Sequence, residues 1–289
     1  MDFLRPTTLP EALALRAGRP DAVPIAGGTD VMVELNFDHR RPGALLDLTR
    51  VAELGEWSRD GELIRLGATV PYARVITELG AELPGLAMAS RTVGSPQIRN
   101  RGTVGGNLGA ASPAGDTHPV LLAVGARIEL ASQRGVRTVG AGEFYTGVKR
   151  SVLADDELIT AVLLPAAGGP QQFAKVGTRN AMVIAVCSFA LAIRPGRREV
   201  GAAVGSAAPT PRRTPGAEEF LRAELPWDRP GPLPDSLKRR FGELVADATE
   251  PIDDVRGSAA YRRHALSVLA RRTLTWAWDD HRERQRSCV

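Results

Sequence analysis

Hydrophobic and polar positions alternate between helix-like and strand-like patterns along the first sixty residues. A Thr-x-x-Glu capping sequence predicts a helix over Glu11–Ala17. Continuous apolar runs at Ala22–Ile25 and Ala44–Leu48 predict buried strands. Between these strands, a glycine pair leads into a second predicted helix, which Thr29 or Asp30 could cap. The order of helix, strand, helix and strand indicates a small α/β unit.

After this unit the pattern changes. An apolar run predicts a strand at Leu63–Leu66, and helices are predicted at Pro71–Leu79, which starts with proline, and at Leu83–Val93. The next segment, Ser95–Asp116, is rich in Gly, Ser, Asn and Pro. Its hydrophobic residues follow neither the helical nor the strand period. It is predicted to be a long loop, and a loop of this length in a compact domain is usually functional or disordered. The apolar stretch that follows, Val120–Leu130, favours order.

In the last part of the chain, the hydrophobic pattern predicts an antiparallel sheet followed by helices. A strand at Glu157–Leu164 is followed by Pro165–Gln172, whose composition is typical of a linker. The later strands are predicted at Phe173–Val176, Met182–Ile193 and Val200–Val204, and the helices near Pro215–Arg222, Pro234–Ala248 and Ser258–Asp279. We therefore expect three parts, residues 1–57, 58–168 and 169–289.

The composition is that of an ordinary globular protein of two or three domains. Hydrophobic residues make up 43% and charged residues 24% of the 289 positions. Lys and Arg number 37 against 33 Asp and Glu, and this excess of +4 is spread along the chain. The pattern favours a solvated surface over binding to nucleic acid. Three arginine pairs, Arg239-Arg240, Arg262-Arg263 and Arg271-Arg272, are predicted to lie mostly on solvated helix faces.

The cysteines and the apolar runs indicate where the protein is located and which cofactors the chain can bind. Cys187 lies in an apolar run and is predicted to be a core residue, whereas Cys288 is predicted to be exposed. No C-x-x-C spacing is present, so we expect neither zinc nor an iron–sulfur cluster in this chain. Residues 1–10 do not resemble a secretory signal, and the apolar run of residues 181–193 is too short to span a bilayer. A cytoplasmic location without a membrane partner is expected.

Two glycine pairs are the main chemical signal. AGGTD (Ala26–Asp30) follows a predicted strand, and TVGGN (Thr103–Asn107) lies in the long polar segment. Because glycine has no Cβ, its N–H can approach a ligand closely, and successive N–H groups can form a nest for phosphate oxygens. Thr29, Thr103 and Asn107 add side-chain donors. A tight turn would explain either pair alone, but both together favour two loops that hold one ligand.

The glycines alone do not identify the ligand. Neither the P-loop pattern nor a G-x-G-x-x-G after a strand is present, and neither loop contains lysine. Asp30 and Asp116 would repel phosphate but suit sugar or ribityl hydroxyl groups, although Asp30 could instead cap its helix. A diphosphate flanked by polyols describes FAD.

AGGTD and TVGGN resemble the two FAD loops in the flavin-binding subunits of molybdenum hydroxylases. This family includes the flavin subunit of xanthine dehydrogenase and the medium subunit of carbon monoxide dehydrogenase. The resemblance continues in order through RNRGTVGGNLGAASPAGDTHPVLLAVGARIEL, DDELITAVLLP, FAKVGTRN, GSAAPTPRR and DVRGSAAYRRHAL. It covers almost the whole chain, and the combined pattern is specific although each glycine loop alone is weak. The chain lacks the extra cysteines of relatives that bind a [4Fe–4S] cluster.

The resemblance implies an α+β fold. A two-subdomain FAD-binding domain of the vanillyl-alcohol-oxidase type precedes a C-terminal domain of antiparallel sheet plus helices. It places sixteen residues around FAD: Pro24, Ile25, Ala26, Gly27, Gly28, Thr29, Asp30, Val31, Thr103, Val104, Gly105, Gly106, Asn107, Asp116, Ile159 and Lys175. Asp116 is implied on FAD hydroxyls, Ile159 beside the flavin, and Lys175 near the isoalloxazine ring. Some relatives stack an aromatic residue on FAD where this chain has Val93.

The implied function is electron transfer without a catalytic residue in this chain. Of the four histidines, His39, His118, His264 and His281, only His118 is near a glycine loop, and a structural or solvent-facing role is expected for it. By resemblance, a molybdopterin-bearing large subunit oxidises the substrate, most plausibly xanthine or hypoxanthine. A small subunit with two [2Fe–2S] clusters passes electrons to FAD, which reduces NAD or another acceptor. The alternatives are a free-standing FAD-dependent oxidoreductase of a biosynthetic pathway and a nucleotide-binding module without flavin chemistry.

Overall fold

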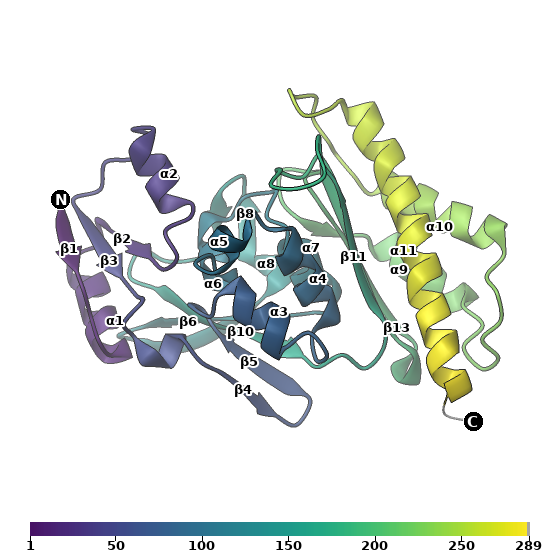
Figure 1. The fold of residues 1–289 in the computed structure, drawn as a ribbon, viewed down its shortest axis with the longest axis horizontal. Coiled ribbons are helices and arrows are strands. Elements are labelled where there is room, and N and C mark those ends of the chain that lie inside the picture. Colours follow the sequence, from purple (N-terminus) through teal and green to yellow (C-terminus); the bar gives the residue numbers. More distant parts are fainter. Residues whose placement is uncertain (288–289) are drawn as a thin grey trace.

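Sheets and helices alternate in layers through the molecule (Figure 1). The computed structural model describes residues 1–287, so the predicted position of Cys288 lies outside the described residues. Helices from the middle of the chain pack against a four-stranded sheet, whose other face is covered by the C-terminal helices (Figure 1). The predicted α+β class is confirmed by this mixed architecture and its mostly antiparallel sheets.

A small parallel sheet begins the chain. Its strands are β1 (Asp2–Leu4), β2 (Ala22–Ile25) and β3 (Ala44–Asp47), in the order β1-β3-β2, and its helices are α1 (Leu9–Gly18), α2 (Val31–Asn36) and the 3₁₀ turn η1 (Ala52–Leu54). The core of this unit includes Ala12, Leu46 and Leu54, which are fully buried. The predicted α/β unit is confirmed, and β1 is an additional strand that the sequence pattern did not indicate.

The starts of α1 and α2 differ from the prediction. Helix α1 begins at Leu9 because Thr8 Oγ1 accepts a hydrogen bond from the Glu11 N–H at 3.3 Å. The Glu11 carboxylate accepts from the Thr7 N–H at 2.7 Å, so the capping box is not reciprocal. Asp30 precedes α2 but makes no side-chain capping bond, and Thr29 makes none either. The predicted cap of α2 was wrong.

The second part contains a five-stranded antiparallel sheet with helices. The sheet order is β4 (Trp57–Asp60), β5 (Leu63–Gly67), β10 (Leu158–Pro165), β6 (Arg127–Ser132) and β7 (Gly135–Gly140). The helices are α3 (Tyr72–Glu78), α4 (Pro84–Thr92), α5 (Pro96–Arg99), α6 (Val104–Ala110), α7 (His118–Ala123) and α8 (Ala141–Phe144), and a ribbon joins β8 (Tyr145–Gly147) to β9 (Arg150–Ser151). The strands and helices predicted between residues 63 and 93 are confirmed, whereas β4 was missed.

The predicted long loop at Ser95–Asp116 was wrong, because much of it is helical. Ser95 and Thr103 each cap the helix that follows, with their hydroxyl oxygens accepting N–H bonds from Ile98 and Gly106. Helix α6 contains both glycines of TVGGN, which disfavour helix by intrinsic propensity. Packing outweighs this propensity, since a Cβ on Gly105 would lie 2.5 Å from the backbone oxygen of Ala68. Only glycine allows α6 to sit this close to the end of β5.

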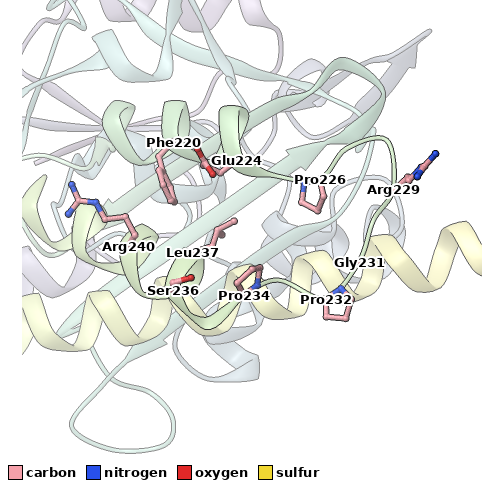
Figure 2. A pocket seen from close by; sticks show the side chains of 10 residues that line it. All are labelled: Phe220, Glu224, Pro226, Arg229, Gly231, Pro232, Pro234, Ser236, Leu237 and Arg240. Atoms are coloured by element: carbon pink, nitrogen blue, oxygen red, sulfur yellow. The ribbon is translucent and has the colours of Figure 1, made fainter.

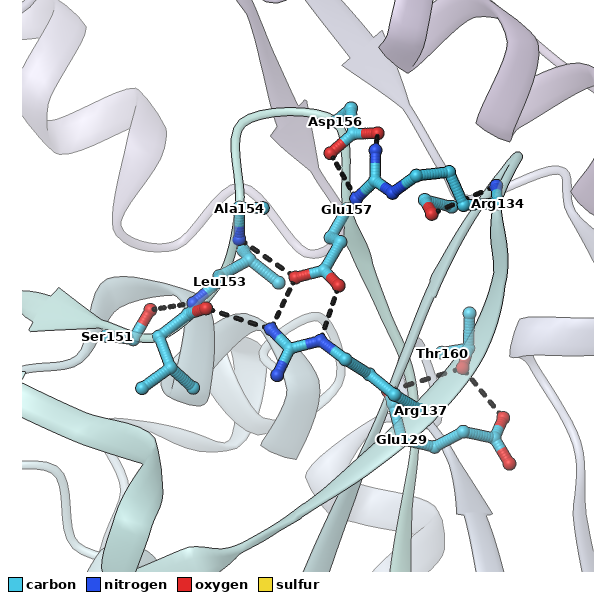
Figure 3. Close-up of polar contacts among 11 residues, drawn as sticks. Glu129, Arg134, Arg137, Ser151, Leu153, Ala154, Asp156, Glu157 and Thr160 are labelled. Carbon is cyan, nitrogen blue, oxygen red and sulfur yellow. Dashed lines mark hydrogen bonds and ion pairs between the residues drawn. The ribbon is translucent and has the colours of Figure 1, made fainter.

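Polar contacts around the buried Glu157 carboxylate fix the entry to the central strand β10 (Figure 3). The Glu157 carboxylate is 4% exposed and accepts two bonds from Arg137, at 2.6 and 2.7 Å, and one from the Ala154 N–H at 2.9 Å. The Arg137 guanidinium holds the pKa of Glu157 below its usual value. Three residues after Glu157, Thr160 Oγ1 donates to the Glu129 carboxylate at 2.7 Å. These bonds set the register in which β10 carries Ile159 toward the helices.

The last part is an antiparallel sheet covered by helices. Its strands are β11 (Gln171–Val176), β12 (Cys187–Arg194), β13 (Glu199–Gly205) and β14 (Arg212–Arg213), with η2 (Pro195–Arg197) between two of them, and its helices are α9 (Pro215–Glu224), α10 (Asp235–Asp247) and α11 (Ala259–Ser287). Strand β12 begins at Cys187, so the predicted strand start at Met182 was wrong. Cys187 is fully buried, as predicted.

One apolar core crosses the predicted boundary near residue 168. It joins Leu86 and Val120 of the helical layer to Phe173, Ala190 and Ala203 of the last sheet. Helices α4 and α7 both pack on this sheet. The boundary at residues 168–169 stays a prediction, but the two parts are packed face to face.

Arg262 is buried, contrary to the prediction of a solvated face. It lies at the start of α11 with 2% of its surface exposed. Its guanidinium donates to the backbone oxygens of Val186 at 2.8 Å and Ser206 at 2.7 Å, and to Asp254 at 2.6 Å. The side chain therefore joins α11 to the ends of β12 and β13.

We expect Arg262→Met to lower the free energy of unfolding by about 3–5 kcal/mol, because it leaves the two backbone carbonyls without this donor and removes one of the two cations that pair with Asp254. The neighbouring Arg263 is exposed, so Arg263→Met should change stability by less than about 0.5 kcal/mol. Urea unfolding of both variants measures the difference. Equal effects would show that Arg262 does not hold the C-terminal helix.

Candidate functional site

The first glycine segment touches the backbone that leads into the second. AGGTD runs from the end of β2 to the start of α2, and TVGGN begins at the start of α6. A Cβ on Gly27 would lie 1.9 Å from the backbone oxygen of Arg101 and 2.8 Å from the Gly102 nitrogen, directly before TVGGN. Gly28 has a φ of +75°, a backbone conformation that favours glycine. The first glycine thus allows this backbone contact, and the second allows the turn into α2.

The first segment presents a row of free donors. Within the described part of the chain, the backbone N–H groups from Gly27 to Val31 make no hydrogen bond, and neither does the Thr29 hydroxyl. Consecutive free N–H groups are suited to an anion such as a phosphate. The pKa of Asp30 is raised by desolvation and by Glu34, although the residue as a whole is exposed. The negative charge of Asp30 would repel an anion beside it, so a phosphate is expected at the N–H groups nearer Gly27.

The second segment keeps one side of α6 clear. The Gly106 N–H is bonded to Thr103 Oγ1 at 2.9 Å, and Thr103 pairs with Pro71 in an isolated bridge. A Cβ on Gly106 would meet only Thr103 Oγ1, at 3.0 Å, and Gly106 is exposed, in contrast to the buried Gly105. Half-buried Asn107 follows on the same helix. An open strip of backbone beside a polar side chain is a surface that a ligand can approach closely.

Asn107 is held at both its side chain and its backbone. Thr117 Oγ1 donates to Asn107 Oδ1 at 2.9 Å. His118 Nε2 lies 3.2 Å from the Asn107 backbone oxygen, which can only accept, so Nε2 carries the proton. His118 is fully buried, and burial lowers its pKa to about 4. His118 is therefore a neutral structural residue.

Asp116 and Lys175 form an ion pair across the two halves of the molecule. Lys175 Nζ, on β11, lies 2.5 Å from Asp116 Oδ2 and also donates to the backbone oxygens of Thr92 and Val183, at 3.0 and 3.1 Å. Both side chains are 9% exposed. Desolvation raises the pKa of Asp116 despite the attraction of Lys175. Asp116 Oδ1 is buried and has no partner in the described residues, so it can accept a bond from a ligand hydroxyl.

Ile159 and Val93 line the same region from two other elements. Ile159 is 8% exposed on β10, and its Cδ1 would lie 4.0 Å from a Cβ on Gly109 of α6. Val93 is the residue that ends α4, directly after Thr92, and it packs on the central core. Its aliphatic side chain offers no aromatic face for stacking.

Three residues of this region were not predicted from the sequence: Tyr72, Thr92 and Thr117. Thr92 Oγ1 donates to Asp116 Oδ2 at 3.0 Å. The fully buried Tyr72 has a raised pKa, caused first by desolvation and then by the negative charges of Asp116 and Asp30. Thr117 was adjacent to a predicted site residue, and this adjacency was the only available signal. Tyr72 and Thr92 approach through tertiary folding alone.

A cavity of about 580 Å³ lies elsewhere, between α9 and the start of α10 (Figure 2). Phe220 and Leu237 point toward it, and proline residues form part of its wall (Figure 2). None of its lining residues belongs to the glycine segments. This cavity is therefore separate from the predicted site.

Comparison with known proteins gives the same assignment for both halves of the chain. Residues 1–167 match the family described as the FAD binding domain in molybdopterin dehydrogenase, and residues 172–277 match the CO dehydrogenase flavoprotein C-terminal domain. The chain belongs to the FAD-binding subunits of the molybdenum hydroxylase family. FAD is the cofactor of this family, and its members are subunits of oxidoreductases.

Individual relatives match over nearly their whole length. The nicotine 6-hydroxylase medium subunit of Paenarthrobacter nicotinovorans is 31% identical and covers 95% of this chain and 96% of its own. The xanthine dehydrogenase FAD-binding subunit of Escherichia coli O157:H7 is also 31% identical, with 95% of both chains covered. A solved carbon monoxide dehydrogenase chain from Hydrogenophaga pseudoflava superimposes with a TM-score of 0.90 at 27% identity, over 97% of this chain and 98% of its own.

The described residues contain neither a metal-ligand cluster nor a helix suited to a membrane. No cluster of three or more His, Cys, Asp or Glu side chains there could hold a metal ion. No helix in residues 1–287 is both long and apolar enough to cross a membrane.

The buried His118 should make this flavoprotein lose stability in acid. Its pKa is about 4 in the folded chain and about 6.5 when unfolded, so the unfolded chain binds more protons between these values. Stability therefore falls as the pH drops from about 6.5 to 4, by up to about 3 kcal/mol from this residue.

His118→Gln, whose amide can replace the Nε2 donor, should show a flatter loss of stability over this range. His264→Gln, at an exposed position, serves as the control and should follow the wild-type curve. Urea unfolding at several pH values between 6.5 and 4 measures the slopes. Parallel curves for the wild type and His118→Gln would contradict the assignment.

Proposed function

We propose that this chain carries electrons through FAD between partner iron–sulfur clusters and NAD or another acceptor. The observation that supports it most is the backbone contact of Gly27 with Arg101 and Gly102, which brings the free N–H groups of Gly27 to Val31 near the start of α6. When bound, FAD supplies the redox chemistry, and the protein supplies binding, orientation and charge.

The free groups of the site fit the parts of FAD. The N–H groups of residues 27–31 suit the diphosphate, and the open backbone at Gly106 permits its close approach. Asp116 Oδ1, which lacks a partner within the described residues, suits a ribityl hydroxyl. Ile159 can contact the flavin from β10. Among the remaining predicted residues, Pro24 and Ile25 end β2 directly before the first segment, and the others belong to the two segments: Ala26, Thr103, Val104, Gly105 and Asn107.

Lys175 is proposed to act on the flavin as half of an ion pair. Its charge is compensated by Asp116 at 2.5 Å, so the pair as a whole is neutral. A free cation near the ring would favour the reduced, anionic flavin, and the pairing weakens that effect without removing it. Because Lys175 lies on β11 and donates to the end of α4, the packing of these two elements determines where its charge lies relative to the flavin.

The exposed helix α2 supports docking of a partner subunit beside the cofactor. It has no buried residue, and Met32 and Val33 on the helix and Phe37 directly after it are 44%, 50% and 70% exposed. Exposed apolar side chains gathered on one short segment are typical of a protein–protein interface. We propose that the [2Fe–2S]-bearing subunit contacts this region and that the molybdopterin-bearing subunit completes the complex.

The substrate class is proposed to be decided outside this chain. Relatives named for nicotine and for xanthine are each 31% identical to it over almost the full length. Oxidation of xanthine or hypoxanthine, the class implied by the motifs, is the first activity to assay in the complex. A free-standing FAD-dependent oxidoreductase is the alternative, and copurification with two partner subunits distinguishes the two.

Gly106→Val should weaken FAD binding by about tenfold or more, because the side chain would fill the open face of α6 where a phosphate oxygen would lie. Gly216→Val is a matched control, since a Cβ on Gly216 meets nothing within 4 Å and the residue lies on α9. Flavin fluorescence titration gives the affinities, and thermal unfolding without FAD separates misfolding from lost binding. A Gly106→Val variant with wild-type affinity would contradict the placement of the diphosphate.

The chain loaded with FAD, without partners, should exchange electrons with NADH or a dye but should not oxidise xanthine, hypoxanthine or aldehydes. The reason is that it offers no catalytic acid–base group and, among its described residues, no metal-ligand cluster. Both half-reactions can be followed by flavin absorbance, with the chain stripped of FAD as the control. Substrate oxidation at the rate of complete complexes would favour the free-standing flavoenzyme.

A further inference from the structure

The amide of Asn107 is held in one orientation by the buried hydroxyl group of Thr117. Thr117 is fully buried and directly precedes α7. Thr117 Oγ1 donates to Asn107 Oδ1 at 2.9 Å. This bond joins the buried start of α7 to the open face of α6.

The direction of the bond follows from the chemistry of the two groups. An amide oxygen can only accept, so the single proton of the threonine hydroxyl is donated to Asn107 Oδ1.

The consequence appears at the other end of the Asn107 amide. With Oδ1 occupied, the Nδ2 group and its two protons point away from Thr117, and Nδ2 has no partner among the described residues. His118 Nε2 fixes the backbone of the same residue through its carbonyl oxygen, at 3.2 Å. Asn107 is thus anchored on two sides and presents only donors.

We propose that Thr117 is a positioning residue that makes Asn107 a fixed N–H donor toward an anionic oxygen of the FAD diphosphate. This inference rests on the proposed function of the glycine segments. A free amide could present its oxygen or its nitrogen, and only the nitrogen attracts an anion. The buried hydroxyl removes the unfavourable orientation before the cofactor binds, which lowers the cost of ordering the site.

The test is a double-mutant cycle on FAD affinity, measured with the full chain, alone or in the complex with which it copurifies. Thr117→Val removes the hydroxyl at nearly constant volume and should weaken FAD binding by about tenfold. Thr117→Ser keeps the hydroxyl and should stay within about threefold of the wild type. In the Asn107→Ala background, Thr117→Val should have no further effect on affinity, because the group it orients is absent.

A merely structural role for Thr117 would give a different result. In that case Thr117→Val would weaken binding equally with and without the Asn107 amide, and such additivity would overturn the proposal. So would wild-type affinity in Thr117→Val. If Thr117→Val does not fold, Thr117→Ala replaces it in the same cycle, and the expected loss of affinity again disappears in Asn107→Ala. Absence of FAD binding by the wild type would instead refute the proposed function.

Discussion

Backbone contact between the first glycine segment and the residues that lead into the second is the constraint on which the rest of the site depends. Gly27 lies against Arg101 and Gly102 at a distance that no side chain permits. This contact brings the free N–H groups after β2 near the start of α6, although the segments are more than seventy residues apart in the sequence. Because the contact is made by backbone atoms, its geometry does not depend on rotamers. The small parallel sheet and the larger antiparallel sheet support its two sides.

The C-terminal sheet reaches the proposed site through Lys175. This residue extends from β11 to Asp116 and to the end of α4, and it also holds the backbone of Val183. One apolar core joins these layers, so they cannot separate without exposing Phe173 and its neighbours. Removing two charges from water costs several kcal/mol per ion, and the pair recovers this only with further hydrogen bonds. The proposed role at the cofactor accounts for such a buried pair better than stability does.

The sequence specified the periodic elements and the chemical class of the site, but not the contacts that shape it. Runs such as Ala22–Ile25 and the capped helices followed from local rules and are confirmed. The helix α6 was missed because its glycines disfavour helix locally, while packing against Ala68 requires them. Tyr72 and Thr92 could not be placed, since both meet Asp116 only in the folded chain. Arg262 was assigned to the surface because its partners, the ends of two strands, are distant in sequence.

The proposed division of labour explains why the chain can resemble subunits of enzymes with different named substrates. Relatives named for nicotine and for xanthine are equally similar to this chain over nearly its full length. Under the proposal this subunit handles only electrons, so its requirements are the same whichever substrate the complex oxidises. The features that would then vary are the charge near the flavin and the surface that meets the partners. In the proposed site these features are the Lys175–Asp116 pair and the exposed apolar helix α2, and both lie outside the two glycine segments.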